Sequence, residues 1–331
     1  MEAPLVSVIV PAYNAERFLA ETLGSLQAQT LTDWEALVVD DGSCDRTAEI
    51  AERFAADDAR LQVFRRSNAG VSATRNFAAA QARGTYLAFL DADDLWAPSK
   101  LAEQVAAFAA EDVDVVFCSL LYFESDPSQM SRPSWPEIGG LHCAAEMAVK
   151  LAGEPFLIPS CVMLRASLLK EVGGFDQSFA ASEDWDLWLR LCAAGSTFWG
   201  VDKPLCLYRQ HATGLSKQWA LCALSHVAIV ERHFPPGTPL RERVDRFARL
   251  SFRNVFTLQG DLGCFEGLDA LFESYRQIDR GYASRFMSVL RAALPFRLFW
   301  FVSRYGVIPL AWHLEGLTKR LKASPEKTAL E

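Results

Sequence analysis

The sequence predicts an α/β fold, with a mostly parallel sheet flanked by helices and a helical appendage at the C-terminus. Apolar, β-branched runs alternate with segments of helical period from residue 6 to residue 121, which is typical of parallel sheets. Polar loops follow these runs, at the positions where such sheets bind ligands. Beyond residue 214 almost every strand signal is lost, and Arg-rich helical stretches continue to the end of the chain.

The first part of the chain supplies the expected elements in order. Buried strands are predicted at residues 6–10, 35–39, 61–64, 86–90 and 113–121. Apolar residues recur on one helical face in the intervening segments 18–26, 50–54 and 101–108. Residues 68–76 are expected to lead from the third strand into a further helix.

After residue 121 the alternation breaks, and residues 124–140 are rich in Pro, Ser and Gly without periodicity. We expect a loop there. The pattern returns with an extended stretch at 161–164, a short helix to residue 172, a helix at about 183–194 and an extended stretch at 198–208. The sequence therefore predicts a domain at residues 1–214 and a mainly helical region at residues 215–331.

Composition excludes several classes of protein. With 50% hydrophobic and 22% charged residues, the chain is too apolar for intrinsic disorder. Its net charge of −8 argues against a nucleic-acid partner. The eight cysteines form no CxxC pair and the N-terminus lacks a signal peptide, so we expect reduced thiols in a cytoplasmic protein. No apolar run reaches the roughly 20 residues of a membrane-spanning helix.

The net charge of −8 is the sum of a basic C-terminal part and a more strongly acidic N-terminal part. Residues 215–331 contain 17 Lys and Arg against 11 Asp and Glu, a net +6, which leaves −14 for residues 1–214. Residues 294–305 combine Arg with large aromatic residues, as do helices that lie at a membrane surface. The favoured alternative is a helical subdomain whose aromatic residues pack on the first domain or in a homo-oligomer.

The first two predicted strands end in polar loops that suit a nucleotide. Residues 11–14 are Pro-Ala-Tyr-Asn, and residues 40–43 are Asp-Asp-Gly-Ser. A carboxylate at the sheet edge can accept hydrogen bonds from a base or ribose, and Tyr13 offers a stacking face. Asp-Gly is also a turn dipeptide, so a plain turn with Asp45 as a helix cap is the alternative.

The fourth strand leads into Asp-Ala-Asp-Asp at residues 91–94. Three carboxylates within four residues repel each other unless a cation or a helix terminus compensates them. An Asp-x-Asp loop offers the oxygen ligands that Mg²⁺ and Mn²⁺ prefer, and a diphosphate suits the remaining positions. The alternative is that Asp94 caps a helix that starts near Pro98.

The loop at residues 68–76 adds a third set of groups suited to a nucleotide or its diphosphate. Gly70 allows close approach of the backbone, and the start of the following helix presents free N–H groups. Arg75 brings a planar, positively charged fork. A surface ion pair is the alternative role for Arg75.

Taken together and in order, these motifs resemble those of family 2 glycosyltransferases, which have the GT-A fold. The matching segments are residues 6–14, 38–43, 68–76, 91–94, 173–176, 182–188 and 208–211. Any one of them is unspecific, but several in the right order at matching spacing are specific. The resemblance covers about residues 4–214 and says nothing about the rest.

The resemblance and the loop chemistry together imply a nucleotide site and a metal site. Asp41 is expected on a pyrimidine N–H and Asp91 at the ribose, with Arg75 assisting at the base. The full set of expected nucleotide-binding residues is Pro11, Ala12, Tyr13, Asp41, Gly70, Arg75 and Asp91. Asp93 and His211 are expected to hold Mn²⁺ or Mg²⁺, and a purely structural role is the alternative for His211.

The resemblance also implies a general base, Asp184, which would take the proton of the acceptor hydroxyl as it attacks the anomeric carbon. The alternative is that Ser182 caps a helix whose first turn holds Glu183 and Asp184, since acids are favoured there. The two roles can coexist. Trp185 and Trp188 are expected to pack this helix into the core.

The resulting interpretation is a metal-dependent, inverting glycosyltransferase in the cytoplasm, at the inner face of the membrane if residues 215–331 bind there. It moves one sugar from a nucleoside diphosphate sugar of the UDP type to a glycan or lipid-linked acceptor. The absence of a Gln-x-x-Arg-Trp motif favours a single transfer. The alternatives are a nucleotidyltransferase, which would need a Gly-rich phosphate loop after the first strand, and a non-catalytic nucleotide-binding scaffold.

Overall fold

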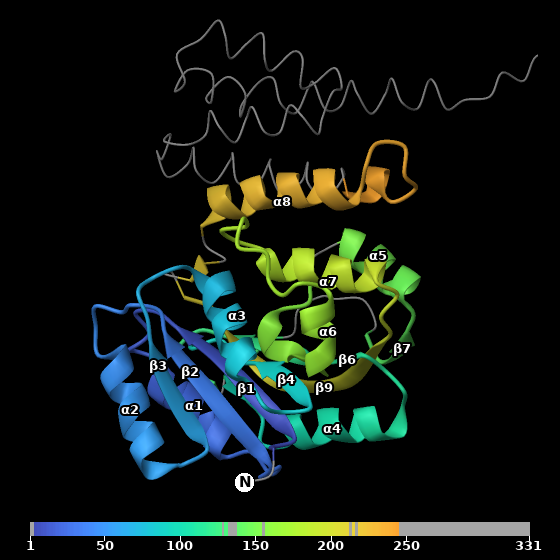
Figure 1. The fold of residues 1–331 in the computed structure, drawn as a ribbon. Helices are drawn as coiled ribbons and strands as arrows, with labels where there is room; N and C mark the ends of the chain where they lie inside the picture. Colours follow the sequence, from blue (N-terminus) through green and yellow to red (C-terminus); the bar gives the residue numbers. More distant parts are fainter. Residues whose placement is uncertain are drawn as a thin grey trace, which may run out of the picture. The chain divides into compact units, whose positions relative to one another are not determined.

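A computed structural model describes residues 3–127, 129–131, 138–153, 156–211, 214–215 and 218–244. The predicted α/β alternation is confirmed, because each strand and helix expected in residues 1–214 forms within a few residues of its expected bounds (Figure 1). The strands are β1 Val6–Ala12, β2 Trp34–Asp40, β3 Leu61–Arg65, β4 Tyr86–Phe89, β5 Leu95–Trp96, β6 Val115–Phe123, β7 Gly140–His142, β8 Val162–Arg165 and β9 Phe198–Arg209. The helices are α1 Leu19–Gln27, α2 Thr47–Asp57, α3 Val71–Gln81, α4 Lys100–Ala110, α5 Ala144–Gly153, η1 Pro159–Cys161, α6 Ala166–Glu171, α7 Glu183–Ala193 and α8 Trp219–His233.

One sheet joins these strands in the order β3-β2-β1-β4-β8-β6-β9-β5, with β7 also paired to β9. Within the described residues, four strand pairings are parallel and four are antiparallel, so the sheet is mixed rather than mostly parallel. Two of the antiparallel pairings arise because β8 inserts between β4 and β6 and runs antiparallel to both, and the other two because β5 and β7 each run antiparallel to β9. Local periodicity does not encode a pairing between segments so far apart in the sequence.

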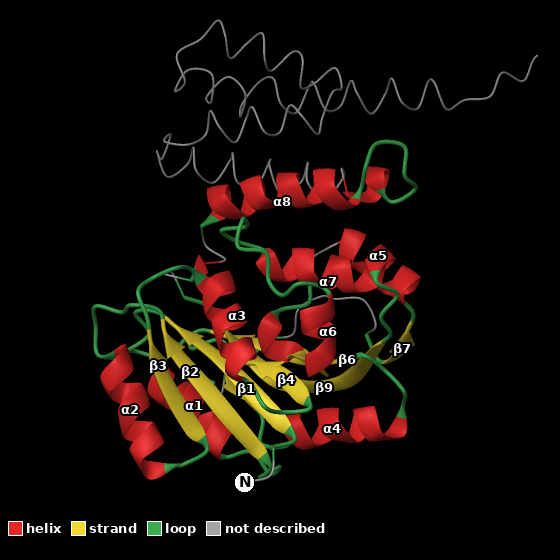
Figure 2. Cartoon of the chain, in the orientation of Figure 1, coloured by secondary structure: helices red, strands yellow, loops and turns green. Residues whose placement is uncertain are grey.

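Helices cover both faces of this sheet. In Figure 2, α3, α6 and α7 lie above the sheet and α4 lies below it. The central strands β1 and β2 are buried along their whole length, as expected for strands covered on both faces. Trp185 and Trp188 of α7 are buried in the core, as predicted, and their indole N–H groups donate to Leu151 and Leu157 carbonyls.

Strand register brings the loops of interest together. The parallel pairing of β1 with β2 places Ala12 opposite Asp40, so the loops that follow both strands start side by side. The antiparallel pairing of β5 with β9 places Leu95 opposite Leu207. Because β5 directly follows the acidic loop 91–94, this second pairing sets that loop beside the end of β9.

Contacts between Cα atoms divide the chain into two units, Met1–Lys217 and Gln218–Glu331. In the second unit the described residues form α8 and a short turn-rich segment that ends at residue 244. Residues 294–305, for which a membrane-surface helix was considered above, lie outside the described residues. Across the described ranges, no helix combines the length and the apolar character needed to cross a bilayer.

Candidate active site

The loops that follow β2 and β3 meet at the carboxylate of Asp41. Its side-chain oxygens accept hydrogen bonds from the backbone N–H groups of Ala69, at 3.1 Å, and Gly70, at 2.8 Å. Gly70 has a φ of +88°, a conformation that favours glycine. A carboxylate has about four lone-pair positions, so Asp41 can accept a further hydrogen bond from a bound base.

The aromatic ring of Tyr13 is exposed and therefore available to a ligand. Pro11 and Ala12 belong to β1 itself, and Tyr13, which follows directly, is 53% exposed. Asn14 links this loop to the next one, because its side-chain oxygen accepts a hydrogen bond from the Cys44 N–H at 2.9 Å. The structure thus brings together the residues predicted for the base site on β1, β2 and the loop before α3, with the exception of Arg75.

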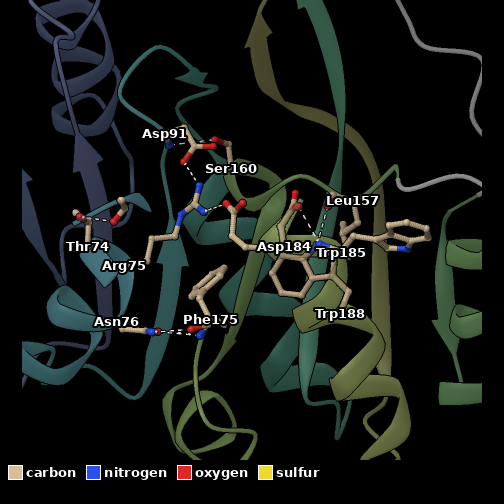
Figure 3. A network of polar contacts seen from close by, with 12 residues as sticks. Thr74, Arg75, Asn76, Asp91, Leu157, Ser160, Phe175, Asp184, Trp185 and Trp188 are labelled. Carbon is tan, nitrogen blue, oxygen red and sulfur yellow. Dashed lines mark hydrogen bonds and ion pairs between the residues drawn. The ribbon is translucent and has the colours of Figure 1, made fainter. Parts of the chain in front are cut away.

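Arg75 lies at the centre of a separate ion network, which Figure 3 shows. Its guanidinium donates to Asp91 at 2.6 Å and to Glu183 at 2.5 Å, and it is 3% exposed. Burial alone would lower the pKa of Arg75, but the two carboxylates outweigh it and raise this pKa. Arg75 therefore bridges the acidic loop and the start of α7, and its predicted contact with the base stays a prediction.

Asp184 lies beside this bridge, in the first turn of α7 (Figure 3). Its Oδ1 accepts a hydrogen bond from the Trp185 N–H at 2.8 Å. Burial, followed by the negative charge of Glu183, raises the pKa of Asp184 to about 7, although Arg75 opposes the shift. A carboxyl group with this pKa can both accept and release a proton near neutral pH.

The predicted capping role of Ser182 is wrong. Ser182 has a left-handed conformation, with φ +58°, and its side chain makes no capping hydrogen bond. Instead, the Asp184 side chain accepts a hydrogen bond from a backbone N–H in the first turn of α7, that of Trp185. A residue other than glycine in this conformation is uncommon and is often found at functional sites.

Asp93 and His211, the two predicted metal ligands, face each other across the β5–β9 pairing. The Nε2 atom of His211 lies 2.7 Å from Oδ2 of Asp93. An imidazole nitrogen and a carboxylate oxygen fit the ligand preferences of Mn²⁺. Across the described residues, no group of three or more His, Cys, Asp or Glu side chains is arranged to hold a metal ion.

Asp94 does not cap a helix, because α4 begins only at Lys100. It is fully buried, and its Oδ1 accepts a hydrogen bond from the Arg209 N–H at 3.0 Å. Burial, followed by the negative charges of Asp93 and Asp91, raises the pKa of Asp94 well above its ordinary range. Burial raises the pKa of Asp91 as well, despite the neighbouring Arg75.

Several residues of the site were not assigned a role from the sequence. Ser160 of η1 accepts a hydrogen bond from the Asp91 N–H at 3.1 Å and so supports the acidic loop. Glu183 was considered only as a first-turn acid, and Arg209 only as part of the motif at residues 208–211. The sequence shows that these are polar residues next to motif positions, but not that they are buried there.

Comparison with known proteins shows which family and fold this chain resembles. The family model described as glycosyl transferase family 2 matches residues 7–173. The uncharacterized glycosyltransferase EpsJ of Bacillus subtilis is 33% identical over 65% of this chain, which spans 63% of EpsJ. The putative teichuronic acid biosynthesis glycosyltransferase TuaG of Bacillus subtilis is 31% identical over 62% of this chain and 79% of its own length.

Solved structures show the same fold. Residues 1–349 of TarS from S. aureus, in complex with UDP-GlcNAc, superpose with a TM-score of 0.63 at 20% identity, covering 99% of this chain and 95% of that one. A mannosyltransferase from Pyrobaculum calidifontis, in complex with GDP-Man and Mn²⁺, gives a TM-score of 0.56 at 18% identity, covering 92% and 87%. The predicted fold class is thereby confirmed.

Proposed function

The chain belongs to glycosyltransferase family 2, and from that premise we propose that it is a metal-dependent, inverting transferase of one sugar from a nucleoside diphosphate sugar. The observation that carries the proposal is the arrangement at the carboxyl edge of the sheet. There the bridge from Asp91 through Arg75 to Glu183 joins the acidic loop to the start of α7, where Asp184 has a pKa of about 7.

Asp184 would act as the general base. Inversion by a single displacement requires that the acceptor hydroxyl lose its proton while it attacks the anomeric carbon. A carboxylate whose pKa is near the working pH can take that proton efficiently, and such catalysis typically contributes about 10²- to 10⁴-fold. The Trp185 N–H fixes one oxygen of Asp184, which leaves the other oxygen for the acceptor.

The donor would lie across the ends of β1, β2 and β4. Tyr13 offers its exposed ring to the base, and Asp41 keeps an acceptor position for a base N–H. Asp93 and His211 would hold Mn²⁺ or Mg²⁺, which when bound neutralises charge on the leaving diphosphate. The complexes of the structural neighbours contain UDP-GlcNAc and GDP-Man, and we propose a UDP-type donor because the family resemblance implies that Asp41 contacts a pyrimidine N–H.

We propose an acceptor on a surface glycan or a lipid-linked precursor of one. The support is the naming of relatives, which include the teichuronic acid biosynthesis protein TuaG and the O-antigen biosynthesis protein RfbC of Myxococcus xanthus. An enzyme that acts at the inner face of the membrane would meet a lipid-linked acceptor there. Contact with the membrane or with a second copy of the chain through residues 215–331 is part of this proposal.

The experiment is binding of UDP, GDP, dTDP and CMP to the full chain, with and without Mn²⁺, followed by assay of nucleotide release from the matching sugar donors. We expect UDP to bind, Mn²⁺ to strengthen its binding, and Asp93→Ala to remove that metal response. Asp112→Ala is the matched control, because the Asp112 side chain is fully exposed. An unchanged metal response in Asp93→Ala, or no release from any donor with lipid-linked acceptors present, would contradict the proposal.

A further inference from the structure

Arg209, the last residue of β9, connects three segments around the acidic loop. Its backbone N–H donates to Asp94 at 3.0 Å, and its Nε donates to the backbone carbonyl of Asp93 at 2.8 Å. Its terminal nitrogen pairs with Glu21 of α1 at 2.8 Å. Arg209 is only 4% exposed, so its side chain is buried beneath the acidic loop, although its partner Glu21 is 56% exposed.

Two aromatic rings hold the guanidinium in place. Its carbon lies 4.8 Å from the centre of the Phe18 ring and 4.5 Å from that of Phe123, within the range of cation–π contact. Phe18 also packs against the imidazole of His211, with ring centres 4.7 Å apart. One ring therefore contacts both the arginine and the histidine that follows it two residues later.

We propose that Arg209 is a positioning residue that sets the separation of Asp93 and His211 and thereby the affinity of this pair for a divalent cation. The inference rests on the proposed function, because it concerns the metal site of that reaction. Arg209 binds the backbone of Asp93 and leaves the carboxylate available. On the other side it fixes His211 through the strand end and through Phe18.

Arginine suits this position better than lysine. The planar guanidinium can donate in two directions, to the Asp93 carbonyl and to Glu21, while its faces pack on two rings. A lysine has a single terminal nitrogen, so Arg209→Lys keeps the charge but cannot maintain both bonds and the stacking. Changes to groups that orient metal ligands typically reduce metal affinity by about 10- to 100-fold.

A purely structural role for Arg209 predicts a different pattern of metal and nucleotide affinities. In that case, its replacement would loosen the whole edge of the sheet, and nucleotide binding without metal would fall together with metal binding. In the proposed role only the cation response changes, because the base site at Asp41 and Tyr13 is built from other strands. Metal binding and metal-free nucleotide binding must therefore be measured separately.

The test uses the full chain and titrates Mn²⁺ by electron paramagnetic resonance of the free ion, with and without UDP, alongside metal-free UDP binding by calorimetry. For Arg209→Lys we expect Mn²⁺ affinity to fall by about 10- to 100-fold and metal-free UDP affinity to stay within about twofold of wild type. Arg190→Lys is the control, because Arg190 pairs with Asp186 and donates to two backbone carbonyls in another part of the fold. It should leave Mn²⁺ affinity unchanged.

A second variant keeps the test decisive if Arg209→Lys fails to fold. Glu21→Gln removes only the charge that anchors the guanidinium, on a side chain that is 56% exposed, and we expect a several-fold loss of Mn²⁺ affinity. Wild-type Mn²⁺ affinity in the variants that fold, or an equal loss of metal-free UDP affinity, would overturn the inference. So would wild-type protein that binds no Mn²⁺ with UDP present. Normal Mn²⁺ behaviour without sugar transfer would instead overturn only the proposed function.

Discussion

Replacing Asp184 by asparagine should abolish transfer and at the same time stabilise the protein. The pKa of Asp184 rises from 3.8 to about 7, mainly through burial and then through Glu183. Each pKa unit corresponds to about 1.36 kcal/mol. Keeping this carboxylate ionised in the folded state therefore costs up to about 4 kcal/mol, which asparagine avoids while its amide oxygen can still accept the Trp185 N–H.

The difference in stability between Asp184→Asn and wild type should change with pH in a definite direction. A carboxyl group whose folded pKa is raised binds a proton more readily in the folded state, so wild-type stability falls as pH rises from about 4 to 7. The advantage of Asp184→Asn should therefore grow with pH, from about 2 kcal/mol at pH 5.5 to about 4 kcal/mol at pH 8. In a domain of this size, that corresponds to a rise of several degrees in Tm.

The assay is urea or thermal unfolding at pH 5.5 and pH 8, combined with sugar transfer under the same conditions. Asp112→Asn is the control, because it makes the same change on a fully exposed side chain, which pairs only with Arg165 among the ion pairs described. We expect transfer by Asp184→Asn to fall by about 10²- to 10⁴-fold. Lower stability of this variant at pH 8 would refute the burial argument, and retained transfer would refute its role as the base.

The remaining predictions concern the same helix and the sheet edge. Glu183→Gln removes a neighbouring negative charge, so the pKa of Asp184 should fall and the acidic limb of the pH–rate profile should move to lower pH; movement to higher pH would contradict this. Gly200→Ala should lower the free energy of unfolding by about 1–3 kcal/mol, because its Cβ would lie 1.5 Å from the Ile138 carbonyl oxygen. Gly24→Ala, which meets nothing within 4 Å in α1, should instead raise it by about 0.5–1 kcal/mol; urea unfolding distinguishes the two outcomes.

The strands and helices of the N-terminal part could be predicted because their signals are local. The continuous apolar runs of β1 and β2 and the amphipathic pattern of α1 each specify an element within a window of a few residues. The place of β8 in the sheet could not be predicted in this way. Its partners β4 and β6 are far away in sequence, and the choice between neighbours depends on how whole segments pack.

In the candidate site, too, features with a local sequence signal could be predicted and features that depend on distant segments could not. The family resemblance implied Asp93 and His211 as metal ligands, and the structure brings these two side chains together. The partners of Arg75 could not be identified, because Glu183 is 108 residues away in sequence and a charged residue in a motif has no local signal of burial. The conformation of Ser182 was missed for a related reason, since propensity favours a serine cap and the fold overrides it.

Five of the 30 acidic residues in residues 1–214 lie together where the proposed reaction takes place. Asp91, Asp93 and Asp94 share one loop, and Glu183 and Asp184 lie across from it at the start of α7. Arg75 pairs with a carboxylate on each side and the guanidinium of Arg209 lies beside the loop, yet these two positive charges are fewer than the five acids. Like charges held at short range favour the arrival of a cation, and a diphosphate needs the same cation. The local imbalance therefore supports joint binding of metal and donor, and it keeps Asp184 in surroundings where it can hold a proton near neutral pH.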